Sequence, residues 1–177
     1  MSRKKKIKKE YSWRLGVGHK VKPEIAAKEI ERIAEKYGVA SPEAVVQEAS
    51  RRNNPLHDDF DWDDSVGGPK WRLHQARQLC GALIVTIIEE KRPVRETRAF
   101  VSVTQNVSED EETGEVEKQR GYLDVETVLS DDDYRAQVLK EAKNYFVRGR
   151  QKYEEIKELG KVFTAIDQFQ LKFDEEA

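Results

Sequence analysis

The chain has little of several residues and patterns that would commit it to a particular environment. Cys80 is the only cysteine among 177 residues, so no internal disulfide can form, and its apolar neighbours predict a buried thiol rather than a nucleophile. The longest apolar run, 82–88, is far too short to span a bilayer. The basic N-terminus lacks the apolar stretch of a secretory signal. These absences predict a reducing, intracellular setting without a membrane partner.

Sequence motifs of catalytic and cofactor sites are also missing. The chain contains no glycine-rich phosphate loop, no nucleophile elbow, no paired metal motif and no Cys–His pair with a recognisable spacing. Gly16 and Gly18 form too short a motif to count. We therefore expect a protein that is not an enzyme and carries no cofactor.

The acidic segment 57–64 matches a calcium site only in part. Asp59, Asp61 and Asp63 alternate like the first ligands of an EF-hand. However, Asp64 stands where that loop needs glycine, and Lys70 stands where it needs a bidentate glutamate. No aspartate here is marked as desolvated enough for general acid–base catalysis. We expect no metal site.

Three other residues of this segment suggest a structural role. His57 lacks co-ligands at a fixed helical spacing, even with His74, which predicts a surface or hydrogen-bonded histidine. Phe60 and Trp62 alternate with the acids, as in an extended segment whose aromatic face packs on a core while its acidic face meets water. We interpret the segment as a clasp between the front of the chain and its body, with Phe60 and Trp62 as candidate partner-binding residues.

Charge is distributed unevenly along a chain whose formal net charge is only −2. Apolar residues make up 37% of it and charged residues another 37%, which predicts a folded domain with one main core and charged ends. Residues 1–12 are interpreted as a flexible basic arm, either a solubilising tail or a segment that neutralises phosphates on DNA. The candidate phosphate contacts in this region are Lys4, Lys5, Lys6, Lys8, Lys9 and Arg14.

Residues 13–54 predict a helical hairpin. Pro23 suits the first turn of a helix whose apolar residues recur every three to four positions until Gly38 ends it. A second helix begins at Ser41 as N-cap, with Pro42 at its first position, and continues to residues 51–52.

Part of this hairpin, 30–46, resembles a helix-turn-helix, in which the start of the second helix faces base edges. The nucleic-acid-binding residues that the resemblance implies are Lys36, Ser41, Glu43, Gln47 and Arg51. Ala40 adds a residue to the turn, and Glu43 and Glu48 bring negative charge toward DNA. A plain helical hairpin that feeds the core stays open as the alternative.

Residues 55–177 predict the rest of an α+β fold. The expected elements are a helix over 71–80, an antiparallel three-stranded meander over 82–88, 94–104 and 121–129, a projecting loop over 105–120, and a long helix from Ser130. The apolar seam of that helix, over 130–159, fits either core packing or pairing with a second copy. The expected fold is an N-terminal helical hairpin, a three-stranded antiparallel sheet and a long C-terminal helix, with the hairpin and the body forming one compact unit.

Four segments carry a resemblance to a known family. They are 41–46 (SPEAVV), 55–57 with 60–64 (PLH and FDWDD), 72–77 (RLHQAR) and 98–103 (RAFVSV). With these segments the chain, over residues 11–167, resembles a family of small uncharacterised proteins encoded by tailed bacteriophages and prophages. The resemblance implies a phage origin and action inside the infected cell, and it assigns no reaction.

The predicted function is that of a non-enzymatic phage accessory protein that is nucleic-acid-associated or regulatory, acting in the host cytoplasm. The alternative is a protein–protein interaction module, in virion assembly or in binding a host factor, that uses Phe60, Trp62 and the 130–159 helix.

Overall fold

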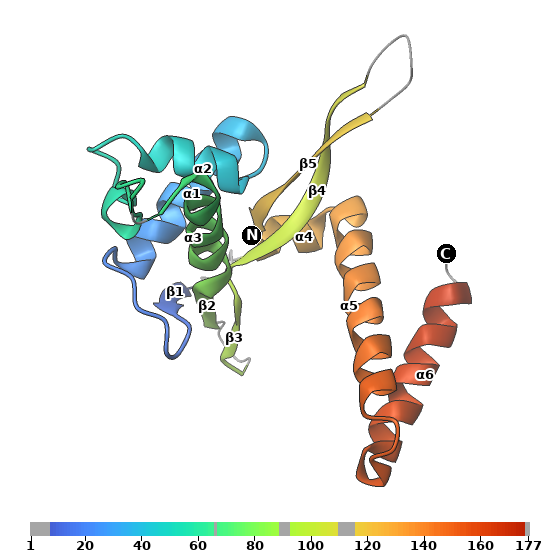
Figure 1. The fold of residues 1–177 in the computed structure, drawn as a ribbon. Helices are drawn as coiled ribbons and strands as arrows, with labels where there is room; N and C mark the ends of the chain where they lie inside the picture. Colours follow the sequence, from blue (N-terminus) through green and yellow to red (C-terminus); the bar gives the residue numbers. More distant parts are fainter. Residues whose placement is uncertain (1–7, 66, 89–92, 110–115, 176–177) are drawn as a thin grey trace, which may run out of the picture. The chain divides into compact units, whose positions relative to one another are not determined.

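The computed structural model describes residues 8–65, 67–88, 93–109 and 116–175 (Figure 1). The chain divides into two compact units, Met1–Ser130 and Asp131–Ala177, and the division falls inside the predicted 55–177 body. The first unit contains β1 (Lys8–Trp13), α1 (Pro23–Tyr37), α2 (Pro42–Ala49), η1 (His57–Asp59), α3 (Pro69–Ala82), β2 (Leu83–Ile88), β3 (Arg95–Arg98), β4 (Phe100–Glu109), β5 (Val116–Asp124) and α4 (Val125–Ser130). The second contains α5 (Asp132–Lys152), η2 (Lys157–Leu159) and α6 (Gly160–Glu175). The predicted α+β class is confirmed.

The helices of the front hairpin begin and end where the sequence predicts, apart from the end of α2. Pro23 opens α1, and Gly38 follows it with a φ of 85°, a conformation that favours glycine. The Ser41 side chain caps α2 by accepting a hydrogen bond from Ala44 N at 3.1 Å. The helix ends at Ala49, two residues short of the predicted 51–52.

The predicted meander is wrong in its strand pairing. β2 lies between β1 and β3 in one antiparallel sheet, while β4 and β5 form a separate two-stranded ribbon. The predicted strand 94–104 is interrupted at Ala99, which is buried and bends the chain between β3 and β4. Its N–H donates to Leu83 O in the first sheet, and its carbonyl accepts from Val125 N. Ala99 therefore belongs to neither strand but joins the two sheets.

Other boundaries also differ from the predictions. Residues 8–12 of the predicted flexible arm lie in β1 because they pair with β2, and residues 1–7 lie outside the described part of the chain. The predicted strand 121–129 ends at Asp124, whose carboxylate accepts from Glu126 N and Thr127 N and so starts α4. The predicted loop 105–120 is mostly strand, leaving only 110–115, outside the described residues, between β4 and β5.

The second unit is a helical hairpin rather than one long helix. Asp131, not Ser130, caps α5 by accepting from Tyr134 N at 2.9 Å. α5 ends at Lys152 instead of continuing to 159, and Glu154 and Glu155 follow at its negative end, where acids are unfavourable. None of the helices in the described ranges is long and apolar enough to cross a bilayer.

The core of the first unit lies between the helices α1, α2 and α3 and one face of the β1–β2–β3 sheet. Large side chains that are fully buried there are Ile30, Ile33, Val45, Leu79, Leu83 and Phe100. The front hairpin is tied to the ribbon by a backbone bridge, in which Ala40 and Tyr122 exchange hydrogen bonds of 3.0 and 3.1 Å, and by side-chain hydrogen bonds from Gln105 to Tyr37 O and from Gln119 to Ser41. Gly121 next to this bridge allows Val39 to approach the ribbon closely.

Substitution of Gly121 tests this junction. A Cβ at that position would lie 2.7 Å from Val39 Cβ and 3.0 Å from the backbone nitrogen of Ser41. We expect Gly121→Ala to lower the free energy of unfolding by about 1–3 kcal/mol through overpacking, measured by urea denaturation. The matched control is Gly81→Ala in α3, where a Cβ meets no atom within 4 Å and better helix propensity should stabilise slightly. Equal effects of the two changes would contradict the close approach.

Candidate nucleic-acid interface

Glu48 is the centre of the charged network on the front hairpin. Its side chain has no exposed surface, and its carboxylate accepts hydrogen bonds from Lys36 (2.7 Å), Tyr37 (2.8 Å), Arg32 (2.7 Å) and Arg51 (3.0 Å). The bond from Lys36 lowers the pKa of Glu48 most, followed by that from Arg32, and together the donors outweigh the opposing effect of burial and hold the pKa at about 2. The carboxylate therefore stays ionised and fixes α1 against α2.

This network corrects the expected roles of three residues. The prediction that Glu48 brings negative charge toward DNA is wrong, because its side chain is fully buried. Lys36 and Arg51 keep partly exposed side chains, but both are ion-paired with Glu48 rather than free for phosphate. Gln47 is exposed on α2, as a contact residue must be.

The start of α2 is covered, which does not fit a helix that enters a DNA groove. Ser41 is fully buried, and its hydroxyl receives hydrogen bonds from Ala44 N and from Gln119 of β5. The adjoining Ala40 is bridged to the same strand. The predicted role of Ser41 at base edges is therefore wrong, since β5 occupies the space that a groove would need.

The predicted phosphate contacts near the N-terminus fall into three groups: residues outside the described range, residues in ion pairs, and one exposed arginine. Lys4, Lys5 and Lys6 lie outside the described residues. Lys8 and Lys9 belong to β1, where they form ion pairs with Glu10 (2.5 Å) and Glu126 (2.7 Å). Arg14 follows β1 directly and is exposed. Of the predicted basic residues in the described part of this region, Arg14 is the one that forms no ion pair.

A groove on the open face of the first sheet brings Arg14 close to a second arginine, Arg98. The groove has a volume of about 460 Å³ and is lined by both arginines, with Ser12, Ile84 and Glu96 among the residues between them. Strand register explains the arrangement, because Ser12 pairs with Ile84 and Ile84 pairs with Arg98, so the three side chains cross the sheet in one row. We call this the arginine groove.

Further arginines extend the positive charge from Arg98 toward the ribbon. Burial raises the pKa of the Tyr122 hydroxyl, while the nearby charges of Arg120, Arg77 and Arg98 act in the opposite direction. Arg120 shares a ribbon face with Tyr122 and donates to Ser102 at 2.8 Å. Arg77 comes from α3, one turn before the buried Cys80. We call Arg77, Arg98 and Arg120 the arginine cluster.

Two arginines of the cluster, Arg77 and Arg98, lack an acidic partner among the described residues. Within the described ranges, neither Arg77 nor Arg98 forms an ion pair or a hydrogen bond to a carboxylate. Both side chains are exposed. Guanidinium groups in this state can bind phosphate oxygens in a bidentate manner. The groove and the cluster share Arg98 and bring together arginines from the β1 end, α3, β3 and β5, with Glu96 as an acidic residue of the groove.

The clasp segment is a structural element. Phe60 is buried, which confirms its predicted packing and removes it as a surface contact for a partner. Trp62 is half-buried. Its indole N–H donates to His57 O at 2.8 Å, and its ring stacks on the His57 ring. The Arg72 guanidinium lies over the Trp62 ring. His57 in turn donates from Nδ1 to Ala49 O at 2.8 Å, confirming the predicted hydrogen-bonded histidine.

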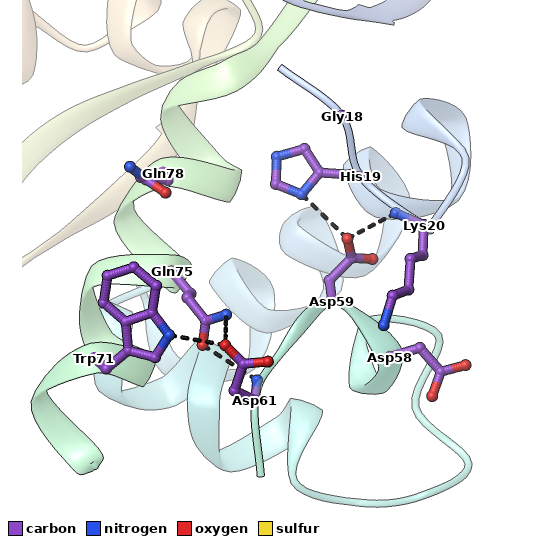
Figure 2. A pocket seen from close by; sticks show the side chains of 9 residues that line it. All are labelled: Gly18, His19, Lys20, Asp58, Asp59, Asp61, Trp71, Gln75 and Gln78. Atoms are coloured by element: carbon purple, nitrogen blue, oxygen red, sulfur yellow. Dashed lines mark hydrogen bonds and ion pairs between the residues drawn. The ribbon is translucent and has the colours of Figure 1, made fainter. Parts of the chain in front are cut away.

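A polar pocket of about 480 Å³ lies beside the clasp (Figure 2). Figure 2 shows the His19 ring and the Lys20 amide converging on Asp59, and the Trp71 indole converging on Asp61. The Asp59 side chain is only 3% exposed. Burial alone would raise the pKa of Asp59, but the hydrogen bonds from His19 and from backbone amides outweigh it and lower the pKa.

The hydrogen bonds in this pocket hold two segments of the chain together and leave Asp59 no free oxygen for a ligand. Both oxygens of Asp59 are already engaged, one by His19 and Lys20 N and the other by Val21 N at 3.0 Å. His19 must carry its hydrogen on Nδ1, because an ionised carboxylate only accepts. In the part of the chain that the structure describes, no group of three or more histidine, cysteine or acidic side chains is placed to hold a metal ion. The pair fixes the 14–22 loop to η1.

The sequence held only weak signals for these residues. Arg98 and Arg120 are separate charges on predicted strands, and nothing local places them beside Arg77 of α3. The contact between His19 and Asp59 spans 40 positions. The burial of Cys80, by contrast, was predicted and is confirmed, and it raises the pKa of the thiol to about 12, so the sulfur stays protonated at neutral pH.

Comparison of the chain with models of protein families, with curated proteins and with solved structures finds no match. The resemblance to phage-encoded proteins therefore stays a prediction.

The Glu48 network predicts a specific pH dependence. Because the folded pKa of about 2 lies below the ordinary value of 4.5, ionised Glu48 stabilises the fold fully above about pH 4.5, and this contribution is lost as the pH falls toward 2. Glu48→Gln should lower the free energy of unfolding at pH 7 by about 3 kcal/mol and flatten its decline between these pH values.

The measurement is urea denaturation of both proteins across that pH range. Glu43→Gln is the matched control, since Glu43 is exposed on the same helix and should change neither the stability nor its pH dependence appreciably. A Glu48→Gln protein as stable as this control at pH 7 would show that the buried carboxylate does not hold α1 and α2 together.

Proposed function

We propose that the chain is a non-enzymatic protein that associates with nucleic acid by binding its phosphate backbone at the arginine groove and arginine cluster. One observation carries the proposal: the exposed Arg14 and Arg98, from separate elements, line one groove together with Glu96, and the charges of Arg98 and Arg77 both act on Tyr122, while in the described ranges neither Arg77 nor Arg98 pairs with a carboxylate. The resemblance to phage-encoded proteins supports the cytoplasm of an infected cell as the place of action.

Binding of this kind is independent of base sequence. Side chains that neutralise phosphates release counterions. The logarithm of the binding constant then falls linearly with the logarithm of the salt concentration, and this salt slope is about 0.7–0.9 per phosphate contact. Arginine is favoured over lysine for such contacts because its planar group bonds two phosphate oxygens at once. The covered start of α2 argues against base readout by the front hairpin. The acidic residues of 109–117 argue against insertion of the ribbon tip into a groove.

The alternative, a protein-binding module centred on Phe60 and Trp62, has less support. Phe60 is buried, and Trp62 is held between His57 and Arg72. Alanine at either position should therefore act mainly on stability.

The double variant Arg77→Gln/Arg98→Gln tests the proposed surface. Fluorescence anisotropy with a labelled single strand and with the matching duplex should show weaker binding and a salt slope that is shallower by about 1.5, measured between about 50 and 200 mM salt. The control Lys28→Gln/Arg52→Gln removes the same charge from exposed positions on the front hairpin. Equal losses of affinity in the two double variants would show that only the net charge of the protein matters. A wild type without affinity for either nucleic acid at low salt would refute the proposed function.

The basic arm is tested separately, without disturbing β1. Lys4→Gln/Lys5→Gln/Lys6→Gln should reduce the salt slope by about 2 and leave the thermal midpoint unchanged. The control removes three exposed lysines of the second unit, Lys140, Lys157 and Lys161, by the same substitution. An unchanged slope in the arm variant would show that the arm is a solubilising tail.

A further inference from the structure

The α5–α6 hairpin leaves large apolar side chains in contact with solvent. No residue of α5 is fully buried. On this helix Tyr145 is 71% exposed, Phe146 45% and Leu139 38%. The same unit also exposes Tyr153, Ile156, Val162 and Leu171. Such a density of exposed aromatic and aliphatic residues is unusual for a surface without a binding partner.

Side-chain contacts join α5 and α6 over the second half of α5. Phe146 meets Phe169 edge to face with ring centroids 6.4 Å apart, and Arg150 lies 3.0 Å from Asp167. These pairs define an antiparallel hairpin. From the turn onward the two helices diverge, as Figure 1 shows. Each helix thus covers only part of the apolar side of the other.

The apolar stripe of α5 is wider than one neighbouring helix requires. Leu139 and Phe146 lie seven residues apart on one side of α5, and Phe146 on that side packs against Phe169 of α6. Ala142 and Gly149 lie on the next strip around the helix, and Tyr145 lies beyond them. A Cβ on Gly149 would meet no atom within 4 Å. The strip from Gly149 to Tyr145 is therefore open, and a stripe of this width is typical of a helix with two neighbours in a bundle.

The exposed apolar area is spread over both helices of the hairpin. From the exposed fractions, the seven side chains contribute on the order of 700 Å² in total, so an interface reaches the roughly 800 Å² per partner of a standard size only if it covers α6 as well as the open strip of α5. The 47-residue unit is also near the size below which helices rarely form a sufficient core without association.

Charge along α5 is complementary to itself in an antiparallel pair. Asp131, Asp132 and Asp133 stand at its start, while Arg148 and Lys152 stand in its last turns. Two α5 helices related by a two-fold axis would place the aspartates of each beside Arg148 and Lys152 of the other, ahead of the Glu154 and Glu155 that follow the helix.

We propose that the α5–α6 hairpin binds a second copy of itself and forms an antiparallel four-helix bundle. The open strip of α5, from Tyr145 to Gly149, packs on the same strip of the partner copy. The two copies are related by a two-fold axis, so that each side chain of the strip is used twice. This assembly does not depend on the nucleic-acid role proposed for the first unit.

Sedimentation velocity of the full chain over a micromolar dilution series tests the proposal. The wild type should sediment as a dimer that dissociates on dilution. Tyr145→Lys should weaken the dimer by about tenfold or more, since it places a charge in the centre of the interface. Its matched control is Asn144→Lys, the same charge on the adjacent, exposed position of the helix, which should leave the dimer unchanged.

A second variant separates loss of association from loss of folding. Gly149→Gln raises helix propensity, and its Cβ meets no atom within 4 Å, so the helix content by circular dichroism should be kept or increased while the dimer weakens. A monomeric wild type at about 100 μM, or a dimer that withstands both Tyr145→Lys and Gly149→Gln, would overturn the proposal and assign the apolar strip to another partner or to the rest of the chain.

Discussion

Ala99 is the residue on which the arrangement of the first unit depends. Its buried position between β3 and β4 lets its N–H complete the β1–β2–β3 sheet at Leu83 and its carbonyl receive Val125 N from α4. With no free polar group left at the bend, the chain can change sheets inside the core without the cost of an unsatisfied hydrogen bond. The bend also determines the position of Arg98. Arg98 is the last residue of β3, on the open face of one sheet, and its charge acts on Tyr122 of the ribbon. The basic surface is thus a consequence of how two small sheets are joined.

Charged residues serve opposite purposes in the two halves of this unit. Around Glu48, basic side chains are organised by a buried carboxylate, so their charges fix the helix pair and are offset locally. Near Tyr122, Arg77 and Arg98 are exposed and in the described ranges form no ion pair with a carboxylate, so their field extends into solvent. Residue type alone does not separate these cases. What separates them is the presence of a desolvated acid, which converts a cation from a ligand-binding group into a structural one.

The parts of the fold that follow from local chemistry could be predicted from the sequence. Pro23, Gly38 and Ser41 mark helix ends through effects confined to a few residues, and the apolar run around Cys80 indicates burial directly. Predictions failed where a segment distant in the sequence determines the conformation or burial of a residue. β1 is a strand because it pairs with β2, about 70–80 positions further along the chain, and Ser41 is buried because β5 covers it. A helix-turn-helix resemblance is sensitive to this failure, since the motif describes two helices and says nothing of what packs on them.

The arginine groove and the arginine cluster contain few arginines, and this limits how tightly they can bind nucleic acid. A few phosphate contacts give an affinity that falls steeply as salt rises, and proteins that bind stably usually make more of them. The arm lysines Lys4, Lys5 and Lys6 precede β1, whose other end leads into the groove at Arg14. If the α5–α6 hairpin also pairs two chains, the contacts available to one nucleic-acid molecule double without any new binding residue. The second binding event then becomes intramolecular, and its gain depends on whether the linked sites can reach the same strand. In this view association and phosphate binding are separate properties of two units, and their combination, rather than either surface alone, sets the strength of binding at physiological salt.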